Sequence, residues 1–261
     1  DLSIEPRLAL SYGSLNDLTW EFRLRPDVPF HSGKMLNIED VLYSLDQAKN
    51  HPSSGVKDQA ASITDSEKIS DEVFQLHTAS PDPLLPSKLS FLLIFPDGSL
   101  EGGEPVPGTG PFTLDTIPAQ LGDDVVLRRF EAYWGQKPAF SEVTLKTFRS
   151  KEEKVAALRS ASLHILASIP PETARSFEFP GFKLQNRPSL EANFLMFHFD
   201  KVFKDKKLRE AIRLALDPNE LSKLTQGFSE PLHQFVGDGI FGFHPELTGV
   251  PVDLKKAESL V

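Results

Sequence analysis

The sequence contains no cysteine among its 261 residues. Disulfide bonds, thiolate metal sites and cysteine nucleophiles are therefore excluded for this chain. Methionine is scarce, with two residues, and 20 Phe stand against 3 Tyr and 2 Trp. The aromatic content is thus mostly apolar core material, and few polar-tipped rings are available to stack against nucleic-acid bases.

Basic residues are fewer than acidic ones. The chain has 28 Lys and Arg against 37 Asp and Glu, which gives a formal net charge of -9. Binding to DNA or RNA needs a basic face that releases counterions, so no nucleic-acid partner is expected. The composition, 39% hydrophobic and 25% charged, is typical of a folded chain with one large domain or two ordinary ones.

Long apolar runs are missing as well. The longest one worth testing as a membrane span surrounds residues 91–95, and it is far shorter than the roughly 20 residues that cross a bilayer. The sequence starts at Asp1, without an initiator Met and without a basic leader before an apolar run. We therefore expect that any export signal was removed or was never part of this sequence.

Signatures of catalysis and of metal binding are also missing. No Gly-x-Ser-x-Gly elbow is present, and the acidic pairs 123–124 and 152–153 are sequence neighbours, which are poorly placed to act as acid and base. No His-Glu-x-x-His motif or close histidine pair occurs. We predict no enzyme, no preformed metal site and no cofactor. The histidines are scattered, at positions 31, 51, 77, 164, 198, 233 and 244.

Periodicity predicts the first elements. Apolar side chains recur at every second position over residues 18–24, which is the pattern of a half-buried strand. Asn37 is placed to cap a helix that has Asp40 near its positive end, with an apolar face at positions 41, 42, 45 and 48. Residues 50–55 break this helix, and residues 72–78 predict another strand.

The Pro- and Gly-rich acidic stretch 96–107 predicts a linker, and we place a domain boundary there. Beyond it, Ser150 opens a helix through a capping box and Asp217 caps another one. The alternation of strands and helices predicts a mixed α/β (α+β) fold. Further strands are expected over residues 112–117, 125–130, 143–148, 182–186 and 193–199, and further helices over 205–216, with positions 208, 211, 212 and 215 facing inward, and over 253–261.

Two short signatures, Gly108-Thr109-Gly110-Pro111-Phe112 and Tyr133-Trp134-Gly135-Gln136-Lys137-Pro138, stand in a fixed order with other pieces of the chain. Residues 19–25 and 30–33 precede them, and residues 208–220 follow. Taken together, these pieces resemble the large extracytoplasmic solute-binding proteins of ABC importers, family 5.

The resemblance implies a periplasmic binding protein type II-like fold, in which two lobes joined by hinge strands enclose a ligand. It makes residues 1–105 the peripheral α+β domain of the first lobe, 106–194 the core of that lobe and 195–261 the beginning of the second lobe. The chain is then expected to be truncated at both ends, with further ligand contacts beyond Val261. Peptide affinity of these residues alone is expected to be millimolar or undetectable.

The function implied by the resemblance is capture of a peptide or a similar small solute and its delivery to ABC permease subunits in the membrane. The protein is expected to be a monomer located in the periplasm or anchored outside the cell. Ligand contacts carried over by the resemblance lie on the strand that enters the hinge. They are Glu191, Asn193, Phe194, Met196 and His198, the last of which stands where the family has Asn.

Several alternatives stay open. Nickel complexes and oligosaccharides are other solutes of the family, and the same fold serves as the sensory domain of transcriptional regulators. A binding-incompetent interaction module is a further alternative. Tyr133 and Trp134 are expected to pack in the interior and in turns rather than to touch ligand, while Gly108 and Gly110 are expected to allow tight backbone geometry between lobes.

Overall fold

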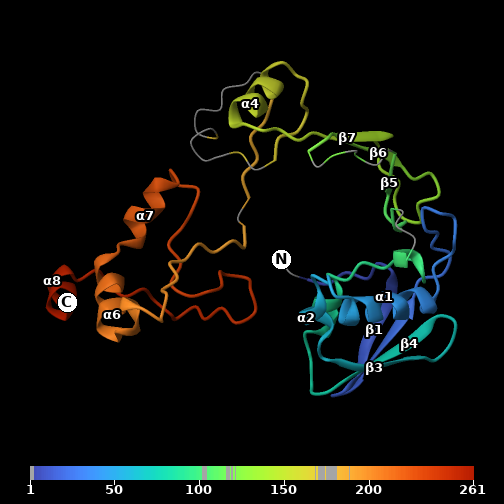
Figure 1. The fold of residues 1–261 in the computed structure, drawn as a ribbon, viewed down its shortest axis with the longest axis horizontal. Helices are drawn as coiled ribbons and strands as arrows, with labels where there is room; N and C mark the ends of the chain where they lie inside the picture. Colours follow the sequence, from blue (N-terminus) through green and yellow to red (C-terminus); the bar gives the residue numbers. More distant parts are fainter. Residues whose placement is uncertain are drawn as a thin grey trace. The chain divides into compact units, whose positions relative to one another are not determined.

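The computed structural model describes residues 3–101, 105–115, 118, 120, 122–167, 169, 174, 181–187 and 189–261. Residues 102–104 of the predicted linker lie outside the described residues. Contacts group the chain into two compact units, residues 3–149 and residues 150–261. Figure 1 labels their helices and strands.

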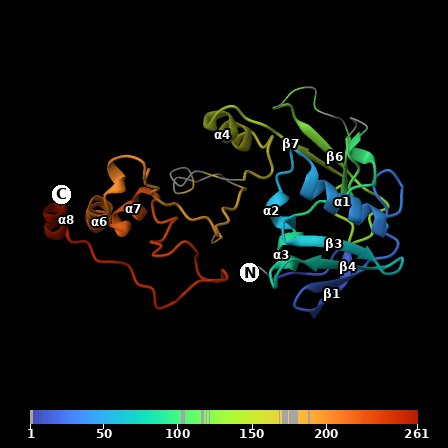
Figure 2. The ribbon, with the colours of Figure 1, turned by 60° about the horizontal axis from the view of Figure 1, so that its bottom comes forward.

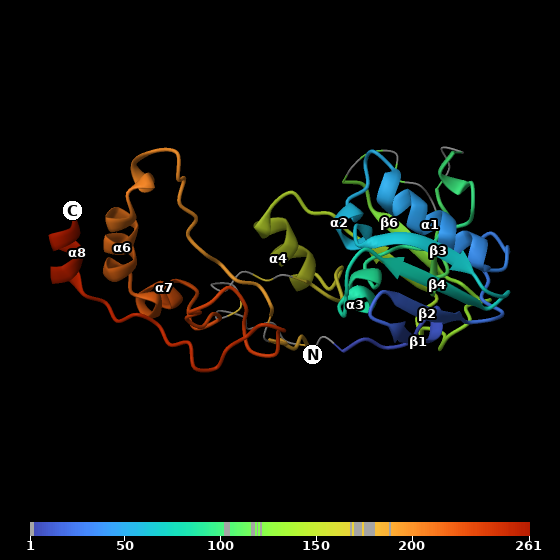
Figure 3. The same cartoon turned by 90° about the horizontal axis from the view of Figure 1, so that it is seen from below.

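A four-stranded antiparallel sheet forms the centre of the unit 3–149, as Figure 3 shows. Its strands are β1 (Ala9–Asn16), β2 (Thr19–Leu24), β4 (Val73–Thr78) and β3 (Ile63–Lys68), in the order β1-β2-β4-β3. Phe22 of β2 lies opposite Phe74 of β4, and their rings stack with centroids 5.2 Å apart. The strands predicted over residues 18–24 and 72–78 are confirmed.

Helix α1 (Ile38–Asn50) packs on this sheet (Figure 2). Asn37 caps it as predicted, and the cap is reciprocal: the Asn37 side chain accepts from the Asp40 N–H, while the Asp40 carboxylate accepts from the Asn37 N–H. Val41, Leu45 and Ala48 are buried against the sheet. This joint core of helix and sheet is the larger of the chain's two buried clusters among the described residues.

Short elements complete the first half of the unit. They are α2 (Lys57–Ala60), α3 (Leu85–Leu89) and the 3-10 turn η1 (Ser99–Glu101). The edge strands β1 and β3 were not predicted. Both carry mostly exposed side chains, so neither shows the hydrophobic pattern that marks a strand in sequence.

A second antiparallel sheet, in the order β5-β6-β7, follows in the same unit. Its strands are β5 (Phe112–Leu114), β6 (Val125–Arg129) and β7 (Glu142–Leu145). All three were predicted, and all are shorter than expected. Residues 116–117 of the first prediction lie outside the described residues, while β7 ends three residues before the predicted end at position 148.

The unit 150–261 consists of short helices and long irregular segments. Its helices are α4 (Lys151–Arg159), η2 (Val202–Lys204), α6 (Lys206–Ala215), α7 (Pro218–Leu224) and α8 (Leu254–Leu260). Helices α6 and α8 lie side by side (Figure 1) around buried Ala211, Leu214 and Ala257. The predicted caps Ser150 and Asp217 are confirmed. The predicted inward position 215 is wrong, because Ala215 is exposed and Leu214 is buried.

The strands predicted over residues 182–186 and 193–199 are wrong: both segments are irregular. A strand needs a hydrogen-bonded neighbour, and the described part of this unit contains no strand that could supply one. No helix of the described residues has the length and apolar character needed to span a membrane.

Candidate functional site

The five residues carried over as ligand contacts lie in one irregular stretch, residues 189–200, which we call the site segment. All five are exposed, with Phe194 at 60% and Met196 at 76%. The Asn193 amide donates to the Glu191 carboxylate at 3.4 Å, and the His198 Nδ1 atom lies 3.8 Å from the Asp200 carboxylate. The structure therefore keeps these side chains accessible to solvent.

The backbone of the site segment is also available for new contacts. Among the described residues, no backbone-to-backbone hydrogen bond involves residues 190–199. Its one local backbone contact is the Glu191 N–H, which donates to the Ser189 hydroxyl at 3.3 Å. An extended chain with free N–H and C=O groups can pair with another extended chain.

Aromatic side chains of the segment find different partners. The ring of Phe194 meets the ring of Phe235 edge to face, with centroids 5.8 Å apart. Phe197 packs against Phe203 at 5.1 Å, and the Arg209 guanidinium lies 4.8 Å from the Phe199 ring centroid. Sequence reasoning missed Phe235, because it lies 41 positions after Phe194 and belongs to no motif.

The signature residues 108–111 make hydrogen bonds within the unit 3–149. The His31 N–H donates to the Gly108 carbonyl at 2.8 Å, and His31 Nε2 lies 3.0 Å from the Gly110 carbonyl. The Trp134 indole N–H donates to the Thr109 carbonyl at 3.0 Å. Three successive carbonyls are thus held by the backbone and ring of His31 and by the ring of Trp134, from distant parts of the unit 3–149. We call this set of contacts the junction.

Further contacts extend this junction to both sheets of the unit. The Pro111 carbonyl accepts from the Phe130 N–H at 2.9 Å, and the Phe130 ring meets His31 edge to face at 5.0 Å. The Arg25 guanidinium lies 4.9 Å from the Trp134 ring centroid. The Trp134 N–H and ring face are thus both engaged within the unit 3–149, where the side chain packs against the larger buried cluster.

The glycines of the signatures differ in what they require. Neither Gly108 nor Gly110 has a positive φ, and a Cβ atom built on Gly110 meets nothing within 4 Å. The tight geometry expected at these two positions is therefore not seen at Gly110. At Gly135, in contrast, a Cβ atom would lie 2.8 Å from the Tyr133 ring, so a side chain there would force the ring to move.

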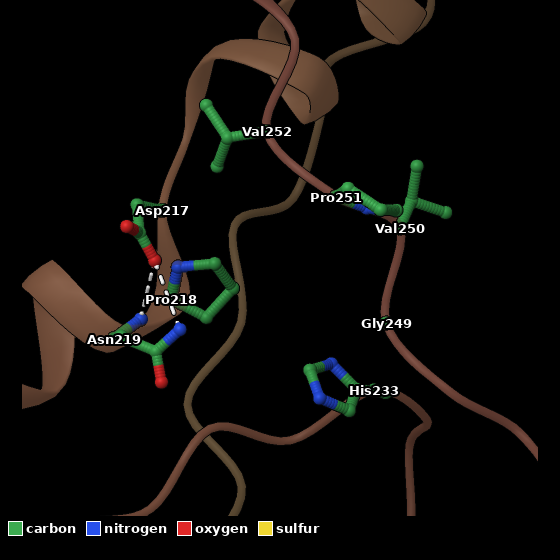
Figure 4. A pocket seen from close by; sticks show the side chains of 8 residues that line it. All are labelled: Asp217, Pro218, Asn219, His233, Gly249, Val250, Pro251 and Val252. Atoms are coloured by element: carbon green, nitrogen blue, oxygen red, sulfur yellow. Dashed lines mark hydrogen bonds between the residues drawn. The ribbon is translucent and has the colours of Figure 1, made fainter.

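A hollow of about 370 Å³ lies in the unit 150–261, between the start of α7 and residues 249–252 (Figure 4). Its Asp217 carboxylate accepts from the backbone N–H and the side-chain amide of Asn219, at 2.8 and 3.2 Å. The His233 ring lies so close to Gly249 that an added Cβ would be 2.4 Å from it. The Asp217 carboxylate is occupied as a helix cap, so the hollow is not a prepared ligand site.

The described part of the chain contains no group of three His, Asp or Glu side chains that could hold a metal ion. The site segment itself carries Glu191 and Asp200 and no Lys or Arg. Its chemistry combines two exposed carboxylates with exposed apolar side chains, and this combination favours a solute that is partly cationic and partly apolar.

Comparison with known proteins gives the chain a family context. The sequence profile described as "Bacterial extracellular solute-binding proteins, family 5 Middle" matches residues 3–261. The nickel-binding protein NikA of Staphylococcus aureus is 24% identical over 97% of this chain and 52% of its own length. The glutathione-binding protein GsiB of Pectobacterium atrosepticum is 25% identical over 100% of this chain and 53% of its own length.

Solved structures show the same fold. The ABC transporter-associated periplasmic binding protein DppA of Helicobacter pylori, in complex with the peptide STSA, has a TM-score of 0.83 at 22% identity. The match covers 99% of this chain and 57% of that protein. The chain therefore spans about half the length of the relatives it matches.

Proposed function

Because the chain belongs to the bacterial extracellular solute-binding proteins of family 5, we propose that it is part of a protein that captures a peptide for an ABC importer. The observation that carries this proposal is the family match across residues 3–261. It is supported by the shared fold of a relative whose structure holds a peptide. The names of these relatives give no support to the alternative of a regulator's sensory domain.

The site segment supplies the proposed contacts. Five exposed side chains would touch the solute: Glu191, Asn193, Phe194, Met196 and His198. The backbone between positions 190 and 199, which makes no backbone-to-backbone hydrogen bond within the described part of the chain, would pair with the main chain of the peptide. Main-chain pairing tolerates varied side chains, which suits a protein that collects peptides.

We further propose the domain order that the resemblance implies. Residues 1–105 would form the peripheral domain, 106–194 the core of the first lobe and 195–261 the start of the second lobe. The junction at Gly108–Pro111, held by His31 and Trp134, stands at the proposed border of the first two domains. Solute would shift an open and closed equilibrium of the lobes, for which a few kcal/mol of preference suffices.

The protein would bind without catalysing a reaction, as a monomer outside the cytoplasm, and would deliver its solute to a permease in the membrane. Nickel complexes form the second candidate class, because one relative is named a nickel-binding protein. Peptide stays the first candidate, because a relative of the same fold holds one.

The two methionines of the chain make a direct test possible. Met196 belongs to the site segment and is 76% exposed, whereas Met35 lies in the unit 3–149 and is 48% exposed. With ¹³C-labelled methionine methyl groups, the protein gives one signal for each. Titration with tetraalanine is expected to move the Met196 signal saturably and to leave the Met35 signal in place.

The same titration separates the candidates. If the Met196 signal responds to a nickel–histidine complex but not to tetraalanine, the solute is a nickel complex rather than a peptide. No response of Met196 to peptide, nickel complex or maltotetraose would contradict solute binding at the site segment. The Met35 signal serves as the internal control for effects that are not local.

A further inference from the structure

Phe194 and Phe235 form an exposed pair that the sequence did not reveal. Their rings meet edge to face at 5.8 Å, and the two residues are 60% and 81% exposed. We call this pair the aromatic platform. Edge-to-face contact is a favourable arrangement of two rings, yet most of the surface of both residues still faces water.

The neighbouring aromatic pairs are different. Phe197 and Phe203 contact each other and are both half-buried, and Phe199 is engaged by the Arg209 guanidinium. The platform is thus the ring pair along this stretch in which both members are more than half exposed. It lies within the proposed ligand contacts, since Phe194 is one of them.

The charges of the site segment indicate which chemical groups a bound peptide should carry. Residues 189–200 contain Glu191 and Asp200 and no Lys or Arg. Exposed carboxylates and exposed rings on one segment suit a ligand that has a cationic group and an aromatic or aliphatic one, because carboxylates pair with ammonium groups and ring faces bury apolar area. A short peptide with a free N-terminus and an aromatic side chain carries both.

We infer that Phe235 is a specificity-determining residue, which together with Phe194 selects peptides that carry an aromatic side chain and a free ammonium group. This inference rests on the proposed function, because it assumes that the site segment binds peptide. A ring contact of this kind corresponds to an affinity gain of about two- to tenfold over an aliphatic side chain.

The experiment follows the Met196 methyl signal, which detects even weak binding. Met196 is two residues from Phe194, so their Cα atoms are within about 7 Å of each other. Three peptides are titrated: Phe-Ala-Ala-Ala, Ala-Ala-Ala-Ala and N-acetylated Phe-Ala-Ala-Ala. The dissociation constant is expected to be about two- to tenfold lower for the first peptide than for either of the others.

Two variants assign this preference to the platform. Phe235→Ala is expected to abolish the difference between Phe-Ala-Ala-Ala and Ala-Ala-Ala-Ala. Phe241→Ala is the matched control, because Phe241 is 85% exposed in the same unit and makes no ring contact among the described residues; it is expected to keep the difference. Unchanged far-UV circular dichroism of both variants checks that the fold is retained.

Failures of the inference and of the proposed function give different results. Equal binding of Phe-Ala-Ala-Ala and Ala-Ala-Ala-Ala, or the same loss in both variants, overturns the inference and leaves peptide binding standing. No response of Met196 to any peptide overturns both. A Met196 signal that moves with protein concentration alone assigns the platform to a second copy of the chain and also overturns the inference.

Discussion

Asp40 is a fully buried carboxylate of the unit 3–149. It is 0% exposed, and it accepts hydrogen bonds from the Asn37 N–H at 3.0 Å and from the Asp97 N–H at 2.8 Å. Lys34 pairs with the same carboxylate. The Asp40 carboxylate thereby completes the capping box of α1 and fastens residue 97 to the helix, so Asp40→Ala removes both attachments at once.

The magnitude follows from these contacts. A hydrogen bond to a charged acceptor contributes about 1.5–3 kcal/mol, and two N–H groups lose such a bond. Both belong to exposed residues, Asn37 and Asp97, so water can replace part of what is lost. Lys34 is 40% exposed, so it can turn to water, and its loss adds little. We expect Asp40→Ala to lower the free energy of unfolding by about 2–3 kcal/mol, because water replaces part of the two lost hydrogen bonds.

Urea denaturation followed by tryptophan fluorescence measures this change, because Trp20 and Trp134 both belong to the unit 3–149. Asp46→Ala is the control on the same helix. Asp46 is exposed and bonds only to the Asn50 side chain, and a loss below about 0.5 kcal/mol is expected. Equal stability of the two variants would refute the role given to Asp40.

Three further predictions concern stability. Burial raises the pKa of Asp82, but hydrogen bonds from Lys88 and Ser62 and the Lys88 charge bring that pKa below its ordinary value. The stability advantage of the wild type over Asp82→Asn should therefore be constant above about pH 5 and shrink below about pH 4; parallel pH profiles in urea denaturation would contradict this. Trp134→Phe removes the hydrogen bond to the Thr109 carbonyl and should destabilise the unit 3–149 by about 1 kcal/mol, measured by the fluorescence of Trp20; a change near zero would show that the junction does not depend on that bond. Leu214→Ala opens a cavity between α6 and α8 and should cost about 2–4 kcal/mol, seen as faster amide exchange in α8; unchanged exchange would disprove the packing.

The sequence was most informative where local chemistry decides the structure. The alternation over β2 reflects a half-buried face, and Asn37 and Asp217 cap their helices through side chains a few positions away. Such signals need no knowledge of distant residues. The fold class could be predicted for the same reason.

The failures have the opposite cause. Strands β1 and β3 exist because β2 and β4 offer hydrogen bonds to them, and their own side chains are mostly exposed. Residues 193–199 have an apolar character suited to a strand, yet no described strand pairs with them. Whether a segment forms a strand depends on a neighbouring strand that can hydrogen-bond to it. The hydrophobic periodicity of the segment alone could therefore not decide either case.

The candidate site was predicted only as far as its position in the chain. The resemblance identified Phe194 and Met196, but Phe235 joins Phe194 through the tertiary fold alone. In the same way, Trp134 was expected to pack in the interior and in turns, whereas its joint hold with His31 on residues 108–110 became visible only in three dimensions.

Equilibrium dialysis with mass analysis tests the central claim most directly, which is that this chain holds a peptide without changing it. At millimolar concentration, Phe-Ala-Ala-Ala dialysed against the protein should be retained weakly but saturably, with a dissociation constant in the millimolar range, be released on dilution and be recovered at its original mass. Cleaved or modified peptide, tight retention at micromolar concentration, or no retention up to the solubility limit of the peptide would contradict the account.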